Sequence, residues 1–183
     1  MHSSTNISAT SIIIKTTIVH TASYFIMGLL ALVLFNYTEK FSSGVLGGYM
    51  RPVSDPIVMF GPAFQLIRGF LFGIVFVLLK DILFTRSRGW LTIWLMLAII
   101  GILSTFGAAP GSIEGAIYTR LSYPTLYDIG MIEVYGQAMI LAVGVFYWVR
   151  NPHNLWVGWG FSIVAALAVL LVLPALFFAP TAG

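Results

Sequence analysis

The sequence contains no cysteine and few charged side chains. The missing cysteine excludes disulfide bonds, thiolate metal sites and cysteine nucleophiles. Charged residues make up 8% of the 183 residues, whereas ordinary soluble domains carry roughly 25%. So few charges cannot cover the surface of a water-soluble fold of this length, while 59% hydrophobic residues suit a lipid environment. The composition therefore excludes a soluble domain and indicates an integral membrane protein.

Sequence motifs for common hydrolytic and nucleotide-dependent chemistry are also missing. The chain has no G-x-S-x-G, H-E-x-x-H or G-x-x-x-x-G-K-[ST] pattern. His20 and His153 lack the spacing of metal or haem ligands, so we expect hydrogen-bonded or water-facing roles for them. The nine Lys and Arg residues are scattered, which excludes the basic stripe of a nucleic-acid-binding protein. The sequence therefore predicts no catalytic residue, no metal ligand, no cofactor and no nucleic-acid partner.

Long apolar runs are what the sequence has instead. Each of the five runs is long enough to cross a hydrocarbon core about 30 Å thick. None alternates with a period of two, as the strands of a membrane barrel do. The pattern predicts an all-α integral membrane bundle of about five transmembrane helices, forming one domain over residues 1–183. The predicted spans are 12–36, 57–84, 90–107, 128–149 and 156–178.

The positive charges beside these runs predict an orientation. The N-terminal segment and the short turns 85–89 and 150–154 fall on one side of the membrane, and two longer polar loops, 37–56 and 112–127, fall on the other. With Lys15 and Lys80 at the adjoining ends of the spans included, the first side carries five Lys and Arg residues and the second carries three. Since positive residues are enriched in cytoplasmic loops, we expect an N-inside, C-outside topology with both long loops outside. The expected location is the plasma (inner) membrane.

Arg68 is the most unusual residue of the predicted spans, because it lies near the middle of the second run. An arginine at mid-bilayer costs roughly 2.5–3.5 kcal/mol, so it requires a partner. Glu133 and Gln137 are spaced i, i+4 on the fourth run, and Gln65 shares a face with Arg68. We predict a buried Arg68–Glu133 ion pair with both glutamines in one network. Such a network either binds a ligand or proton or simply holds two helices together.

The two long loops hold the other candidate ligand-binding residues. Arg51 and Asp55 precede the second run, and Glu114 and Arg120 follow the third. Each stands among prolines and glycines next to a helix end on the predicted outer side. These loops are expected either to fold over the Arg68 region as a lid or to form ordinary solvated turns.

Small residues at helical spacing predict where helices approach one another closely. Gly69 and Gly73 form a small-xxx-small face on the second run, and Gly136 and Gly144 form a less regular one on the fourth. Such faces pack helices within one chain or between copies of a chain.

Three classes of function are compatible with this sequence. The favoured class is binding or transport of a small polar or anionic ligand at the Arg68 site, in the outer half of the bundle. The second is a non-catalytic accessory or assembly subunit of a larger membrane complex, with no cavity and a fully paired Arg68. The third is a membrane-embedded enzyme acting on lipid headgroups. The expected partners are the lipid bilayer and either further copies of this chain or a larger membrane complex.

Overall fold

The computed structural model of the protein describes residues 7–42, 48, 50–120 and 130–178. The chain is 77% helical, and the described residues contain no strand, so the predicted all-α class is confirmed. Within the described ranges, four helices are long and apolar enough to cross a membrane, the last of them over Leu155–Leu173 of a longer helix. They are α1 (Ala9–Leu34), α5 (Gly61–Leu78), α10 (Met131–Arg150) and α11 (Leu155–Phe178).

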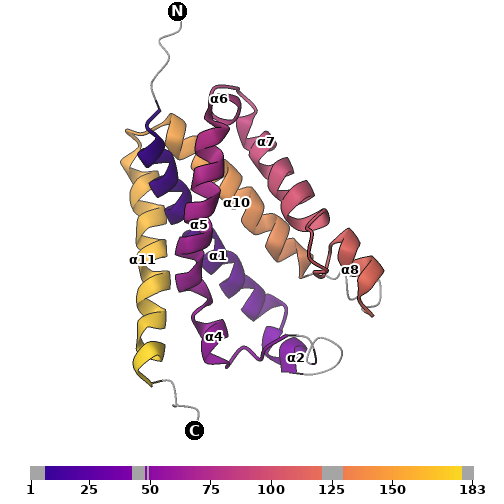
Figure 1. Ribbon diagram of the computed structural model, residues 1–183. Helices are drawn as coiled ribbons and strands as arrows, with labels where there is room; N and C mark the ends of the chain where they lie inside the picture. The colour runs from indigo at the N-terminus through magenta and orange to yellow at the C-terminus, as the bar shows by residue number, and fades with distance from the viewer. Residues whose placement is uncertain (1–6, 43–47, 49, 121–129, 179–183) are drawn as a thin grey trace, which may run out of the picture.

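Helix α1 is the centre of the bundle and packs against α5, α10 and α11 (Figure 1). Its contact with α5 is very close, because the small-xxx-small face of α5 lies against the α1 backbone. A Cβ added at Gly69 would lie 2.8 Å from the Thr17 Cα, and one added at Gly73 would lie 2.8 Å from the Ile13 Cα. The predicted close approach is therefore confirmed, and it occurs within the chain.

The predicted span 57–84 is divided into three helices. They are α4 (Pro56–Met59), α5 and α6 (Lys80–Leu83), separated by Phe60 and Leu79. Proline lacks the backbone N–H and is favoured in the first turn of a helix. Pro56 begins α4 and Pro62 is the second residue of α5, so the first break falls between two helix-starting signals.

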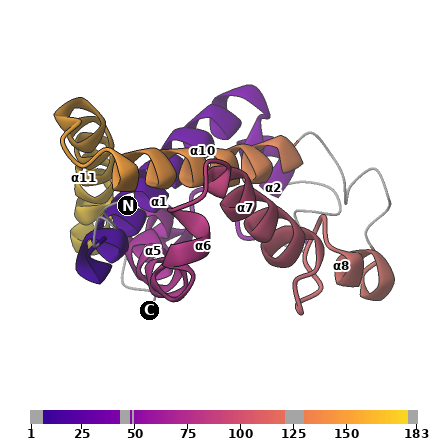
Figure 2. The ribbon, with the colours of Figure 1, turned by 90° about the horizontal axis from the view of Figure 1, so that it is seen from above.

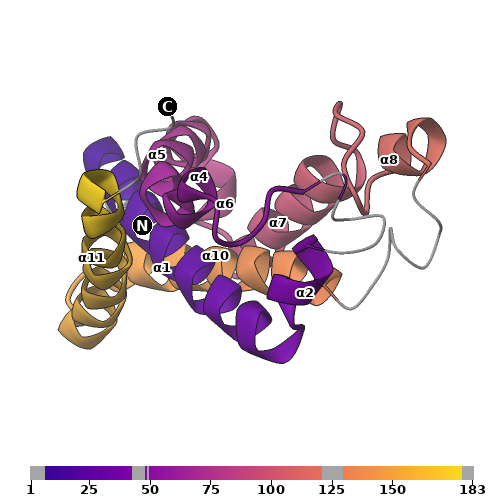
Figure 3. The same cartoon turned by 90° about the horizontal axis from the view of Figure 1, so that it is seen from below.

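The predicted third span differs most from its expectation. Helix α7 (Gly89–Met96) continues into a π-helix, η1 (Leu97–Leu103), and together they form an apolar helix shorter than the four long ones. Helix α7 packs along α10, where the Trp94 indole N–H donates to the Tyr135 carbonyl oxygen over 3.4 Å. Figures 2 and 3 show α7 on the side of the bundle away from α11.

The loop regions contain short helices that were predicted as irregular loops. They are α2 (Tyr37–Ser42) and α8 (Ile113–Tyr118). Ser112 explains the start of α8, because its hydroxyl oxygen accepts a hydrogen bond from the Gly115 N–H over 2.9 Å. The start of α1, the α6–α7 turn and the α10–α11 turn lie at one end of the bundle, and α2, α4 and α8 lie toward the other (Figure 1).

Candidate functional site

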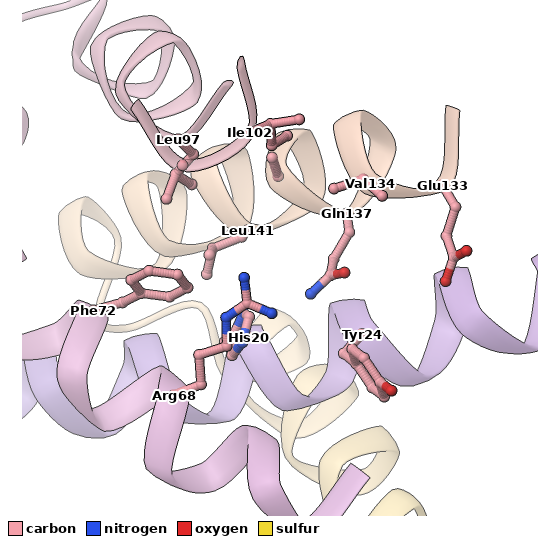
Figure 4. A pocket seen from close by; sticks show the side chains of 12 residues that line it. His20, Tyr24, Arg68, Phe72, Leu97, Ile102, Glu133, Val134, Gln137 and Leu141 are labelled. Carbon is pink, nitrogen blue, oxygen red and sulfur yellow. The ribbon is translucent and has the colours of Figure 1, made fainter. Parts of the chain in front are cut away.

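A cleft of about 220 Å³ lies between α1, α5, η1 and α10. Its apolar wall includes Phe72, Leu97, Ile102 and Leu141. The polar side chains converge from three helices, and Figure 4 shows Glu133 and Gln137 reaching from α10 toward α1 and α5, which carry the other three. These polar residues are His20 and Tyr24 of α1, Arg68 of α5, and Glu133 and Gln137 of α10.

Arg68 faces this cleft because the adjacent face of α5 is occupied by its contact with α1. The buried residues of α5 are Gln65, Gly69, Gly73 and Phe76, which form one stripe at helical spacing. Arg68 lies beside that stripe and remains exposed, with its guanidinium carbon 5.6 Å from the centroid of the Phe72 ring. Among the described residues, no carboxylate lies within ion-pair distance of this guanidinium.

The predicted Arg68–Glu133 ion pair is therefore wrong as a direct contact. Both side chains line the same cleft, as does Gln137, but Glu133 accepts a hydrogen bond from the Tyr37 hydroxyl of α2 instead. Its carboxylate points toward the part of α1 near Gly28. The prediction placed the two residues at similar depth, whereas Arg68 lies toward His20 and Glu133 toward Gly28, about two turns further along α1.

Gln65 does not join Arg68 either, because it hydrogen bonds to His20. The His20 Nε2 lies 3.0 Å from the Gln65 Oε1, and the Gln65 Nε2 donates to the Gly61 carbonyl oxygen over 3.0 Å. Since the amide oxygen can only accept, the proton of this contact belongs to the His20 Nε2. The His20 Nδ1 is buried and has no hydrogen-bond partner within the described part of the chain.

His20 and Tyr24 are functional candidates that the sequence interpretation missed. Because the first span was predicted to begin at residue 12, the prediction placed His20 near the N-terminal, inner end of that span. Helix α1 begins at Ala9, which makes His20 the twelfth of its 26 residues. A histidine with a tyrosine at i+4, both within an apolar helix, is a signal that could have identified this face.

The four candidate residues of the long loops do not line the cleft. Arg51 and Asp55 pair with each other over 2.9 Å, and the Asp55 carboxylate also accepts from the Ile57 N–H over 2.9 Å. The hydrogen bond from Arg51, followed by the one from Ile57, lowers the pKa of Asp55. Glu114 lies in the first turn of α8, and Arg120 is exposed just beyond that helix.

No group of three or more His, Asp or Glu side chains in the described ranges is arranged to hold a metal ion. Comparison with protein-family models, with curated proteins and with solved structures finds no match to this chain. The cleft is therefore the feature of the molecule that bears on its function.

Proposed function

We propose that this protein binds a small polar or anionic solute in the cleft that contains Arg68. The observation that carries the proposal is a guanidinium that lines a cleft and has no carboxylate partner among the described residues. An arginine inside an apolar bundle is expensive without a partner. A bound anion would supply that partner, and the Gln137 amide beside it would add hydrogen bonds.

Two features favour this function over the alternatives. An accessory subunit predicts a fully paired Arg68 and no cavity, whereas Arg68 lines a cleft of about 220 Å³. A lipid-headgroup enzyme requires two carboxylates, or a carboxylate with Arg51 or Arg120, at one place. Glu133 is the one carboxylate among the described residues that line the cleft, and Arg51 pairs with Asp55 elsewhere.

The proposal includes a five-pass topology in which α7 and η1 make the third crossing. Helix α6 and the start of α7 lie at the same end of the bundle as the start of α1, whereas α8 lies toward the opposite end (Figure 1). This arrangement supports a crossing between Leu83 and Met131. With the N-terminus on the cytoplasmic side of the plasma membrane, α8 lies on the outer side and the α6–α7 turn lies on the cytoplasmic side.

This topology is tested with single cysteines, since the chain has none of its own. In intact cells, a membrane-impermeant maleimide is expected to label Tyr118→Cys at once, and Ser87→Cys only after permeabilisation. Labelling of both residues from the same side would contradict a crossing by α7 and η1.

Access to the cleft tests the binding proposal. A binding site for a polar solute must be reached by water, and only a thiolate in contact with water reacts quickly with a charged methanethiosulfonate. In lipid nanodiscs we expect Gln137→Cys to react on the order of a hundredfold faster than Ile163→Cys. Ile163 is a suitable control because it is 53% exposed on the apolar surface of α11. Equally slow reaction at both positions would refute a solute site in this cleft.

A further inference from the structure

The two charges of the cleft lie far apart along α1. The Arg68 guanidinium lies 5.6 Å from the Phe72 ring, and His20 contacts the same ring with a centroid distance of 5.0 Å. The guanidinium and the His20 imidazole therefore both lie against this one ring, which places the guanidinium nearer the level of His20 than that of Gly28. At the other end, the Glu133 Oε1 lies 3.8 Å from the position that a Cβ would take at Gly28. His20 and Gly28 are eight residues apart, which corresponds to about 12 Å along a helix.

A polar side chain lies between these charges, and apolar side chains lie beyond the cationic end. Figure 4 shows the Gln137 amide between Glu133 and Arg68, with Phe72 and Leu141 beyond the guanidinium. Glu133 accepts a hydrogen bond from Tyr37, and a carboxylate can accept about four, so it retains capacity for another donor. The cleft therefore has a cationic end, an anionic end and a middle that accommodates a short chain.

We infer that the solute bound here is a small zwitterion, with its anionic group on Arg68 and its cationic group on Glu133. This inference rests on the proposed function and specifies the class of ligand. An anion alone would compensate Arg68 and leave Glu133 without a counter-charge, whereas a zwitterion compensates both charges.

The separation of the charges also limits the length of the zwitterion. A hydrogen-bonded ion pair takes up roughly 3.5 Å between charge centres at each end of the cleft. When the rise of about 12 Å between these two levels of α1 is taken as the separation of the charges, about 5 Å remains between the two charges of the solute. An extended chain of four bonds between a carboxylate carbon and an ammonium nitrogen has about this length. An ω-amino acid of four carbons fits this separation, and an α-amino acid is too short.

His20 provides a second and independent indication of a ligand at the cationic end. The side chain is 1% exposed, it lines the cleft, and its Nδ1 has no hydrogen-bond partner among the described residues. A buried acceptor of this kind is unfavourable when it stays unpaired. A water molecule or hydroxyl that accompanies the bound carboxylate would donate to this nitrogen.

The experiment is equilibrium dialysis of the full chain in lipid nanodiscs against radiolabelled γ-aminobutyrate. Three competitors each change one feature: butyrate lacks the ammonium, butylamine lacks the carboxylate, and α-aminobutyrate has its charges too close together. We expect each to bind at least about tenfold more weakly than γ-aminobutyrate, which is the effect of losing one charged contact. Glu133→Gln should reduce γ-aminobutyrate affinity to that of butyrate, and Arg68→Gln should weaken both. Glu114→Gln is the matched control and should change neither.

The outcomes separate this inference from the proposed function. Butyrate binding as tightly as γ-aminobutyrate, and weakened by Arg68→Gln, would overturn the zwitterion while retaining an anion site. Equal affinity for α-aminobutyrate would overturn the charge separation. Absence of Arg68-dependent binding for all four probes would overturn the inference, and the cysteine test in the cleft would then decide the proposed function. The comparison of the four probes uses the unmodified protein, so it remains decisive even if a variant fails to fold.

Discussion

The close contact between α1 and α5 predicts that a single methyl group at Gly69 destabilises the protein. A Cβ at this position would lie 2.8 Å from the Thr17 Cα and 3.1 Å from the Thr17 carbonyl oxygen. Both are backbone atoms and cannot rotate away, so in Gly69→Ala the two helices must separate until the contact reaches the ordinary 3.4 Å. A gap of this size forfeits about a quarter of each dispersion contact across the interface.

The magnitude follows from the number of contacts that are weakened. An atom pair contributes about 0.1–0.2 kcal/mol, and roughly 40 pairs, as a single buried leucine makes, would lose about 1–2 kcal/mol in total. This agrees with the roughly 1–3 kcal/mol measured for overpacked sites. Such a loss matters in a bilayer, because packing rather than water exclusion holds membrane helices together.

Gly160→Ala is the matched control, because no atom lies within 4 Å of a Cβ added on α11 at that position. We expect Gly69→Ala to lower the free energy of unfolding, measured by steric trapping in bicelles, and Gly160→Ala to leave it unchanged or raise it. Gly69→Ala combined with Gly73→Ala should be less destabilising than the sum of the two, since the first methyl already separates the helices. A Gly69→Ala protein as stable as Gly160→Ala would refute the close packing of α1 on α5.

Three further predictions concern the hydrogen bonds of the bundle and its loops. Gln65→Leu leaves the His20 Nε2 without its partner and should lower the free energy of unfolding by about 1–3 kcal/mol; an unchanged thermal midpoint would contradict the assigned hydrogen bond. Ser112→Ala removes the cap of α8, worth about 1 kcal/mol, so amide exchange within that helix should become about fivefold faster while exchange in α1 is unchanged; equal rates in α8 would contradict the cap. The Arg51 contact lowers the pKa of Asp55 in the folded protein, so the contribution of Asp55 to stability is complete above its ordinary pKa of 3.8 and is lost as pH falls below that value. Asp55→Asn should therefore remove this part of the acid dependence of thermal unfolding, and parallel wild-type and variant curves would contradict the assignment.

The long helices could be predicted from sequence because hydropathy alone determines them. Helix α11 begins at Leu155, one residue before its predicted start, and α10 ends at Arg150, one residue beyond its predicted end. The predicted start of the fourth span at residue 128 lies outside the described residues. Helix α1 begins at Ala9 instead of residue 12. Its first turn includes Thr10 and Ser11, which are polar and therefore lie outside the apolar run.

The breaks and the short helices depend on local signals that hydropathy does not contain. The first break in the second span falls between Pro56 and Pro62, and α8 depends on the Ser112 cap. A prediction from the number of apolar residues detects neither the break nor the cap. The change from α7 to a π-helix at Leu97 has no evident signal in the sequence, since Leu97–Leu103 is uniformly apolar apart from one glycine.

The sequence predicted which residues lie in the candidate site, but it did not predict which of them are in contact. Arg68, Glu133 and Gln137 do line one cleft, as their polar character within apolar runs indicates, but Arg68 and Glu133 lie at different levels along α1. Whether two side chains touch also depends on how each helix is rotated, and the glycine stripe of α5 fixes that rotation through tertiary packing. Glu133 accepts its hydrogen bond from Tyr37, which lies on a helix that was predicted as a loop.

The central claim is that Arg68 makes the cleft attractive to anions, and charge selectivity at Gln137→Cys tests it most directly. The measurement compares the reaction rates of an anionic and a cationic methanethiosulfonate, with Arg68→Gln and, as a control on the α6–α7 turn, Arg88→Gln added in turn. Even with water-like screening, a unit charge at about 6 Å changes the energy of each reagent by about 0.7 kcal/mol in opposite directions. We therefore predict that Arg68→Gln lowers the ratio of anionic to cationic rates about tenfold, whereas Arg88→Gln leaves it unchanged. A ratio that is the same with and without Arg68 would contradict the account.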